Sequence, residues 1–192
     1  DVRDTSSYLA AHIEGSYGIP LVTPLIVWAG WVIPFGAKIV LIANHPAERV
    51  EATRQLVRIG YDDIVGFLDG SVEAWQSNGL PVTSTKHISA PQLKDWLSQN
   101  DSPNVLDVRF NREWHTGHIH GAKHIEAGSL PEVARSILHE DEPLVVHCQR
   151  GNRSTVALSI LEQKGFKNVY ALEAGLQSWT DAGYELVLNG KE

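Results

Sequence analysis

The chain has 192 residues, of which 43% are hydrophobic and 20% charged, and its formal net charge is -7. This length suits one medium domain or two small ones with apolar cores, and the composition is not that of a disordered chain. The acidic balance argues against a nucleic-acid or membrane-surface partner. A single cysteine excludes an internal disulfide and fits a reducing, cytoplasmic compartment. Residues 21–31, an apolar run interrupted by Thr23, Pro24 and Gly30, are too few to cross a membrane.

In chain order, the first predicted element is a strand at Asp1-Val2-Arg3, which lacks the residues expected to precede it. A helix is predicted to begin near Pro46, because proline is favoured in the first turn of a helix. The chain contains no methionine, so we expect it to be a fragment of a longer protein.

The second half of the chain alternates strands with helices. Its β-branched and apolar runs predict strands over residues 104–109, 144–147 and 169–172. Helices are predicted from the cap at Ser89 through Leu97, over residues 156–161 before Gly165, and over residues 176–182 before Gly183. This alternation indicates an α/β fold with a mostly parallel sheet.

The two halves of the chain repeat one another. Asp1-Val2-Arg3 recurs as Asp107-Val108-Arg109, and His12-Ile13-Glu14-Gly15 recurs as His118-Ile119-His120-Gly121. Several such matches in the same order indicate two copies of one unit. We therefore expect two α/β domains, residues 1–83 and 84–192, each a mostly parallel sheet flanked by helices.

The only cysteine, Cys148, stands between the predicted strand 144–147 and the helix that follows. Helix N-termini at the carboxyl ends of parallel strands bind anions, and nearby backbone N–H groups and arginines favour a thiolate. We expect Cys148 to be a nucleophile and the rest of its loop to bind substrate: Gln149, Arg150, Gly151, Asn152, Arg153 and Ser154. The alternatives are a small buried cysteine without chemistry and arginines that are only solvated surface charges.

The second copy resembles the rhodanese family of sulfurtransferases. The residues that carry the resemblance are Leu106-Asp107-Val108-Arg109, Glu113-Trp114, Gly117-His118-Ile119, Gly121-Ala122, the loop from Cys148 to Ser154, and Glu173-Ala174-Gly175 with Trp179. His120 departs from the family pattern, which usually has proline there. The resemblance implies that Cys148 takes a sulfane sulfur from thiosulfate or a low-molecular-weight persulfide and passes it to cyanide, a thiol or sulfite. No cofactor is implied.

Other functions remain open for this loop. Phosphatases of related fold use Cys-x5-Arg, whereas only four residues separate Cys148 from Arg153, and this shorter loop favours sulfur transfer. A non-catalytic binding or regulatory module and a redox sensor are the further alternatives.

The first copy lacks the residues of this chemistry. Ala43 takes the place of Cys148, Pro46 removes a backbone donor, and Glu48 puts a negative charge where an anion would bind. We expect this copy to be catalytically silent and His45 not to be a replacement catalyst.

Two further expectations concern partners and metals. The compact copies, with Trp28 and Trp31 in the first, resemble the carboxyl-terminal part of fusions in which a metallo-β-lactamase-fold persulfide dioxygenase precedes two rhodanese domains. The dioxygenase and its iron would then lie outside this chain, and Trp28 and Trp31 would be packing residues. Four histidines cluster in ten residues without the spacing of a known metal site, so we expect no metal there; they are His115, His118, His120 and His124.

Overall fold

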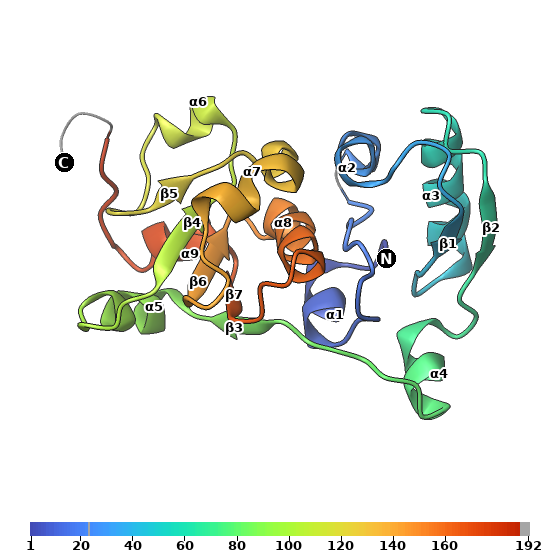
Figure 1. Cartoon of the computed structure of the whole chain (residues 1–192), viewed down its shortest axis with the longest axis horizontal. Coiled ribbons are helices and arrows are strands. Elements are labelled where there is room, and N and C mark those ends of the chain that lie inside the picture. The colour runs from blue at the N-terminus through green and yellow to red at the C-terminus, as the bar shows by residue number, and fades with distance from the viewer. Residues whose placement is uncertain (23, 189–192) are drawn as a thin grey trace. The chain divides into compact units, whose positions relative to one another are not determined.

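The computed structural model describes residues 1–22 and 24–188. Residue 23, within the apolar run 21–31, and residues 189–192, at the end of the second predicted domain, lie outside the described residues. The chain forms two compact units, Asp1–Ser84 and Thr85–Glu192 (Figure 1). The repeat had placed the boundary between residues 83 and 84.

The second unit is built on a parallel sheet with the strand order β3-β7-β6-β4-β5. Its strands are β3 (Lys86–Ile88), β4 (Asn104–Asp107), β5 (Lys123–His124), β6 (Leu144–His147) and β7 (Val169–Leu172). Strand β6 lies in the middle and is buried along its whole length, as its unbroken apolar run predicted.

Helices cover both faces of this sheet (Figure 1). Helices α5 (Ala90–Leu97) and α9 (Leu176–Asp181) contact each other and enclose a core that contains Leu93, Val145 and Trp179. On the other face, α8 (Asn152–Gln163) contacts β6, β7 and α7 (Leu130–Ile137). Two short helices, α6 (Asn111–Trp114) and η1 (Ala127–Ser129), complete the unit.

Local sequence signals explain where several of these elements begin and end. Ser89 caps α5, since its hydroxyl accepts a hydrogen bond from the Gln92 N–H at 3.4 Å. The predicted strand 104–109 is shorter in the structure and ends at Asp107. The Asp107 carboxylate accepts the Arg109 N–H at 2.9 Å, and this local turn takes the backbone out of the ladder.

The first unit contains a smaller sheet, in which β1 (Ile39–Leu41) pairs in parallel with β2 (Ile64–Phe67). Its helices are α1 (Thr5–Ala10), α2 (Leu25–Val32), α3 (Pro46–Val57) and α4 (Ser71–Ser77). The predicted strand at residues 1–3 was wrong. These residues form no assigned strand, although they make backbone hydrogen bonds of the strand type. Val2 N–H donates to the Ile42 carbonyl and Ile19 N–H to the Asp1 carbonyl, both at 2.8 Å, and Leu21 N–H donates to the Val2 carbonyl at 3.1 Å.

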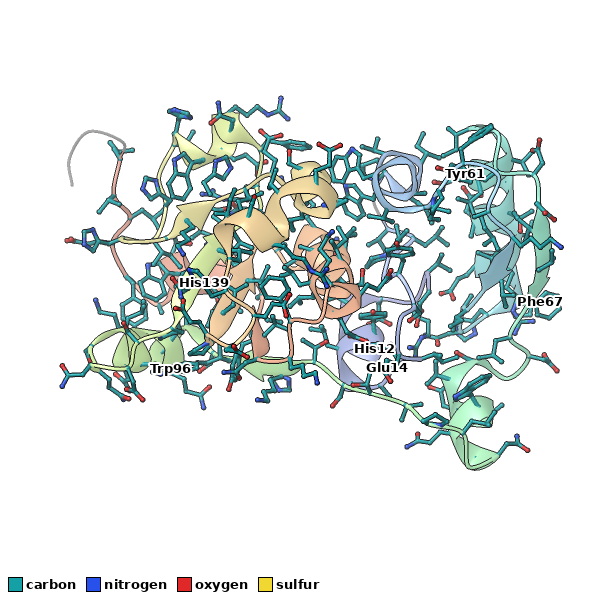
Figure 2. All side chains as sticks on the ribbon, in the orientation of Figure 1. His12, Glu14, Tyr61, Phe67, Trp96 and His139 are labelled. Atoms are coloured by element: carbon teal, nitrogen blue, oxygen red, sulfur yellow. The ribbon has the colours of Figure 1, made fainter. Side chains whose placement is uncertain are left out.

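The repeat is visible in matching contacts within each unit. Arg3 forms an ion pair with Asp1 at 2.7 Å, and Arg109 forms one with Asp107 at 2.6 Å. His12, labelled in Figure 2, stacks on Tyr8 with ring centroids 4.1 Å apart, and His118 stacks on Trp114 at 3.4 Å. The two units therefore share an ion pair and a ring stack at equivalent positions, although the first has the smaller sheet. Among the described residues, no helix has the length and apolar character needed to cross a membrane.

Candidate active site

Cys148 follows the last residue of β6 and lies in the loop that leads into α8. Gly151, the residue before α8, has a φ of 107° and a ψ of -33°. Residues with a Cβ rarely adopt a positive φ, so the glycine allows the backbone to curl around the cysteine. The loop thus joins the carboxyl end of a central parallel strand to a helix N-terminus, where anions are commonly bound.

The Cys148 sulfur faces its own loop. The Gly151 N–H donates to Sγ at 3.1 Å, and the Ser154 hydroxyl lies 3.5 Å from the same sulfur. The cysteine is only 2% exposed. A buried cysteine without chemistry would face apolar side chains, whereas this sulfur contacts two hydrogen-bond donors, which stabilise negative charge.

The carbonyl groups of the loop are held by the first turn of α9. Leu176 N–H donates to the Cys148 carbonyl at 2.8 Å, and Gln177 N–H donates to the Gln149 carbonyl at 3.1 Å. Gly175 makes this approach possible, because a Cβ on it would lie 2.5 Å from the Cys148 carbonyl oxygen. In the sequence analysis, Gly175 was noted only as part of the motif Glu173-Ala174-Gly175, and its contact with the active loop was not predicted.

Arg153 does not contact the sulfur; its charge is paired with Glu113 of α6. Nη1 and Nη2 of Arg153 lie 2.5 and 2.7 Å from the two carboxylate oxygens. Burial alone would lower the pKa of Arg153, but the hydrogen bond with Glu113 and the charge of Cys148 raise it. The Arg153 hydrogen bond also lowers the pKa of Glu113. Sequence reasoning listed Glu113 only within a motif and did not assign it to the site.

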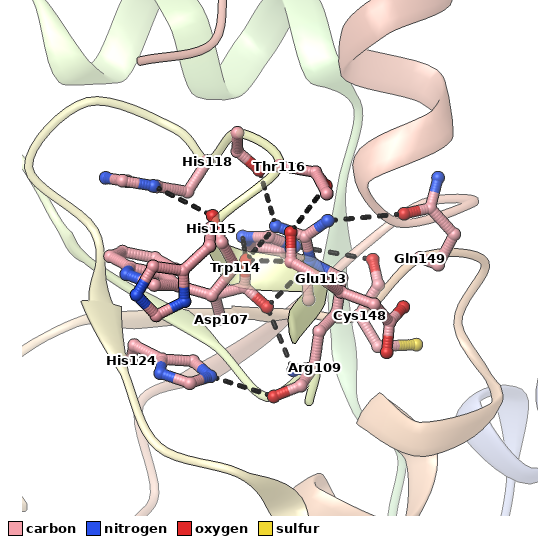
Figure 3. A network of polar contacts seen from close by, with 12 residues as sticks. Asp107, Arg109, Glu113, Trp114, His115, Thr116, His118, His124, Cys148 and Gln149 are labelled. Atoms are coloured by element: carbon pink, nitrogen blue, oxygen red, sulfur yellow. Dashed lines mark hydrogen bonds and ion pairs between the residues drawn. The ribbon is translucent and has the colours of Figure 1, made fainter. Parts of the chain in front are cut away.

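The other predicted loop residues differ in their contacts. Gln149 turns toward Arg109, with its Oε1 atom 3.4 Å from Nη1 (Figure 3), and Arg150 is exposed to solvent. Asn152 begins α8 and is half-buried. The side chain of Ser154 and the backbone N–H of Gly151 are the groups in direct contact with Sγ.

A buried charge network lies close to the loop (Figure 3). Arg109 donates to both carboxylate oxygens of Asp107 and, at 2.7 Å, to the Gly117 carbonyl. His147 Nε2 is 3.8 Å from Asp107. Burial raises the pKa of Asp107, but the electrostatic interaction with His147 and the Arg109 hydrogen bonds outweigh it and leave this pKa below its usual value. Burial also lowers the pKa of His147, although the nearby Asp107 carboxylate acts in the opposite direction.

The histidine cluster has packing contacts. Trp114 stacks with His118 and with His124, whose ring centroid is 4.9 Å away. His124 Nε2 also contacts the Arg109 carbonyl at 2.8 Å, and His115 Nδ1 contacts the Asn111 carbonyl at 2.7 Å. Within residues 1–22 and 24–188, no three His, Cys, Asp or Glu side chains are grouped as a metal site requires.

The equivalent loop of the first unit is already occupied by a side chain. Its buried Ala43 stands at the cysteine position. The Glu48 carboxylate accepts the N–H groups of Asn44 at 2.9 Å and His45 at 3.2 Å. Two loop amides that could bind an anion are therefore satisfied by the chain's own carboxylate.

Residues 1–78 and 89–182 match the family model of the rhodanese-like domain, so the chain belongs to this family. It is 37% identical over 91 residues to the thiosulfate sulfurtransferase GlpE of Pseudomonas aeruginosa strain LESB58, which covers 47% of this chain and 80% of that protein. It is 33% identical over 98 residues to YrkF of Bacillus subtilis, named as a sulfur carrier protein, and spans only 52% of its length. Among solved structures, a rhodanese-like domain protein of Staphylococcus aureus is similar with a TM-score of 0.50 and 28% identity, covering 55% of this chain and 100% of that one.

Proposed function

We propose that the chain is a sulfurtransferase in which Cys148 carries the transferred sulfur. The observation that supports this most strongly is the Cys148 sulfur 3.1 Å from the Gly151 N–H, in a loop that opens a helix. In the first step the Cys148 thiolate attacks the outer sulfur of thiosulfate. A sulfur–sulfur bond forms on the enzyme as the bond to the sulfonate group breaks, and sulfite leaves with that electron pair. A low-molecular-weight persulfide would donate in the same way and release a thiolate.

In the second step an acceptor removes the sulfur from the Cys148 persulfide. Cyanide, a thiolate or sulfite attacks the terminal sulfur, and the cysteine leaves as a thiolate, ready for the next donor. The chain has one cysteine, so it cannot resolve the persulfide as an internal disulfide. Sulfur must pass to an external acceptor, and the kinetics should be ping-pong.

Substrate binding is assigned to the loop from Gln149 to Ser154, whose N–H groups stabilise charge on the moving sulfur, with the exposed Arg150 attracting anionic donors. The first unit is assigned no catalysis, because Glu48 occupies its loop amides and Ala43 supplies no nucleophile. The fused metallo-β-lactamase-fold domain and the cytoplasmic location stay predictions, to be tested on the complete gene and by cell fractionation.

Thiocyanate formation from thiosulfate and cyanide tests the proposed function. The chain should turn over with parallel double-reciprocal lines, and Cys148→Ser should abolish turnover. Hydrolysis of a chromogenic phosphate ester without thiocyanate formation would instead indicate a phosphatase. If the chain shows neither activity, the alternative of a non-catalytic binding or regulatory module is favoured.

A further inference from the structure

The pair formed by Glu113 and Arg153 joins the active loop to a segment 40 residues earlier in the sequence. Both terminal nitrogens of the guanidinium are bound to the carboxylate, at 2.5 and 2.7 Å. The backbone N–H of Phe110 donates to Glu113 at 3.2 Å, and the Phe110 ring centroid is 5.1 Å from Arg153 Cζ. The guanidinium is therefore fixed from two sides by the turn that carries α6.

The consequence of this pairing is that the sulfur receives its hydrogen bonds from Gly151 and Ser154 and not from Arg153. The arginine stands in the first turn of α8, close to the loop, yet its charge is balanced by a carboxylate. A free guanidinium at this position would attract a doubly charged donor more strongly than a singly charged one, because Coulomb energy scales with charge.

The first unit offers an internal comparison, because both members of the pair are replaced together. Ser7 stands at the position of Glu113 and Glu48 at that of Arg153. Ser7 binds the helix-capping Asp4, while Glu48 turns onto the loop amides of Asn44 and His45. In the first unit, the side chain at this position, Glu48, binds the loop amides. In the second unit, Arg153 at the same position is bound by a carboxylate, and the loop contains a cysteine.

We propose that Glu113 is a positioning residue that acts through Arg153 and thereby sets the preference of the site between doubly and singly charged sulfur donors. By holding the guanidinium, Glu113 leaves the loop amides to bind the donor and limits the positive charge that the donor meets. This inference rests on the proposed sulfur transfer. It deepens that proposal by naming what determines donor selectivity.

The test compares thiosulfate with methanethiosulfonate, which carries the same transferable sulfur but one negative charge fewer. Cyanide is the acceptor for both donors, and kcat/KM is measured for each. Glu113→Gln keeps the shape of the side chain and removes its charge. We expect kcat/KM to rise about tenfold for thiosulfate and about threefold for methanethiosulfonate, because the freed charge acts on two negative charges in one donor and on one in the other.

Two further variants show whether the effect passes through Arg153. Adding Arg153→Gln to Glu113→Gln should return the ratio of the two kcat/KM values to that of Arg153→Gln alone. Asp101→Asn removes an equal charge from an exposed turn before β4, at the amino end of the parallel strands and opposite the carboxyl end that Cys148 follows, and should leave the ratio unchanged. Equal changes for both donors in Glu113→Gln, or a ratio that rises without Arg153, would overturn the inference. If the unaltered chain transfers sulfur from neither donor, the proposed function itself fails.

Discussion

A methyl group added at Gly175 should distort the active loop without changing the cysteine side chain itself. The Cβ of Gly175→Ala would lie 2.5 Å from the Cys148 carbonyl oxygen and 2.9 Å from the carbonyl carbon and oxygen of Gln149, all backbone atoms that cannot rotate away. Gly175 also has a φ of 63° and a ψ of -152°, a region used almost only by glycine. Overpacking costs about 1–3 kcal/mol and the backbone strain about 1–3 kcal/mol more.

Gly183→Ala is the matched control for this change. Gly183 also has a positive φ, 78°, but a Cβ there would meet nothing within 4 Å. Urea unfolding of the full chain should therefore show a loss of about 1 kcal/mol for Gly183→Ala and about 2–6 kcal/mol for Gly175→Ala. Thiocyanate formation should fall at least about tenfold only in Gly175→Ala, since a shift near 1 Å in a catalytic group has large effects. Equal losses of stability and activity in the two variants would refute the role given to Gly175.

Three other expectations follow from the contacts described above. The second unit should lose stability as the pH falls below about 6.5. The pKa of His147 is lowered in the folded chain, so at these pH values the imidazole is protonated more readily in the unfolded chain. Urea unfolding at pH 5.5 and 7.5 should show a smaller difference in stability for His147→Gln than for the unaltered chain. In a Cys148→Ser background, Ala43→Cys should gain no sulfur from thiosulfate by mass spectrometry, because Glu48 holds the surrounding amides, and a gain would contradict that account. His45→Ala should leave thiocyanate formation within about twofold of the unaltered chain, since a surface substitution outside the site has little effect; lost activity would assign the first unit a catalytic part.

The sequence predicted the parts of the fold that depend on local signals. The strands at 144–147 and 169–172 and the cap at Ser89 lie where they were expected, because an unbroken apolar run and a serine before Pro91 act within a few residues. The parallel strands flanked by helices were confirmed as well. The prediction of a strand at residues 1–3 was wrong, because a strand there needs hydrogen bonds to segments distant in the sequence, and those that form do not make a regular strand.

The sequence predicted the parts of the candidate site whose residues lie close together along the chain. Cys148 and the curl at Gly151 follow from a cysteine and a glycine between a strand and a helix. The partner of Arg153 could not be derived from spacing, because Glu113 is 40 residues away and meets it only in the folded unit. The contacts of Glu48 could not be predicted either, since the sequence indicated its charge but not the two backbone amides that its carboxylate binds.

The most direct test of sulfur transfer through Cys148 is the intact mass of the chain after brief exposure to thiosulfate and removal of excess donor. The account predicts a gain of one sulfur atom that maps to the peptide containing Cys148, disappears on addition of cyanide and is absent from Cys148→Ser. An unchanged mass, or a sulfur that persists in the presence of cyanide, would contradict it.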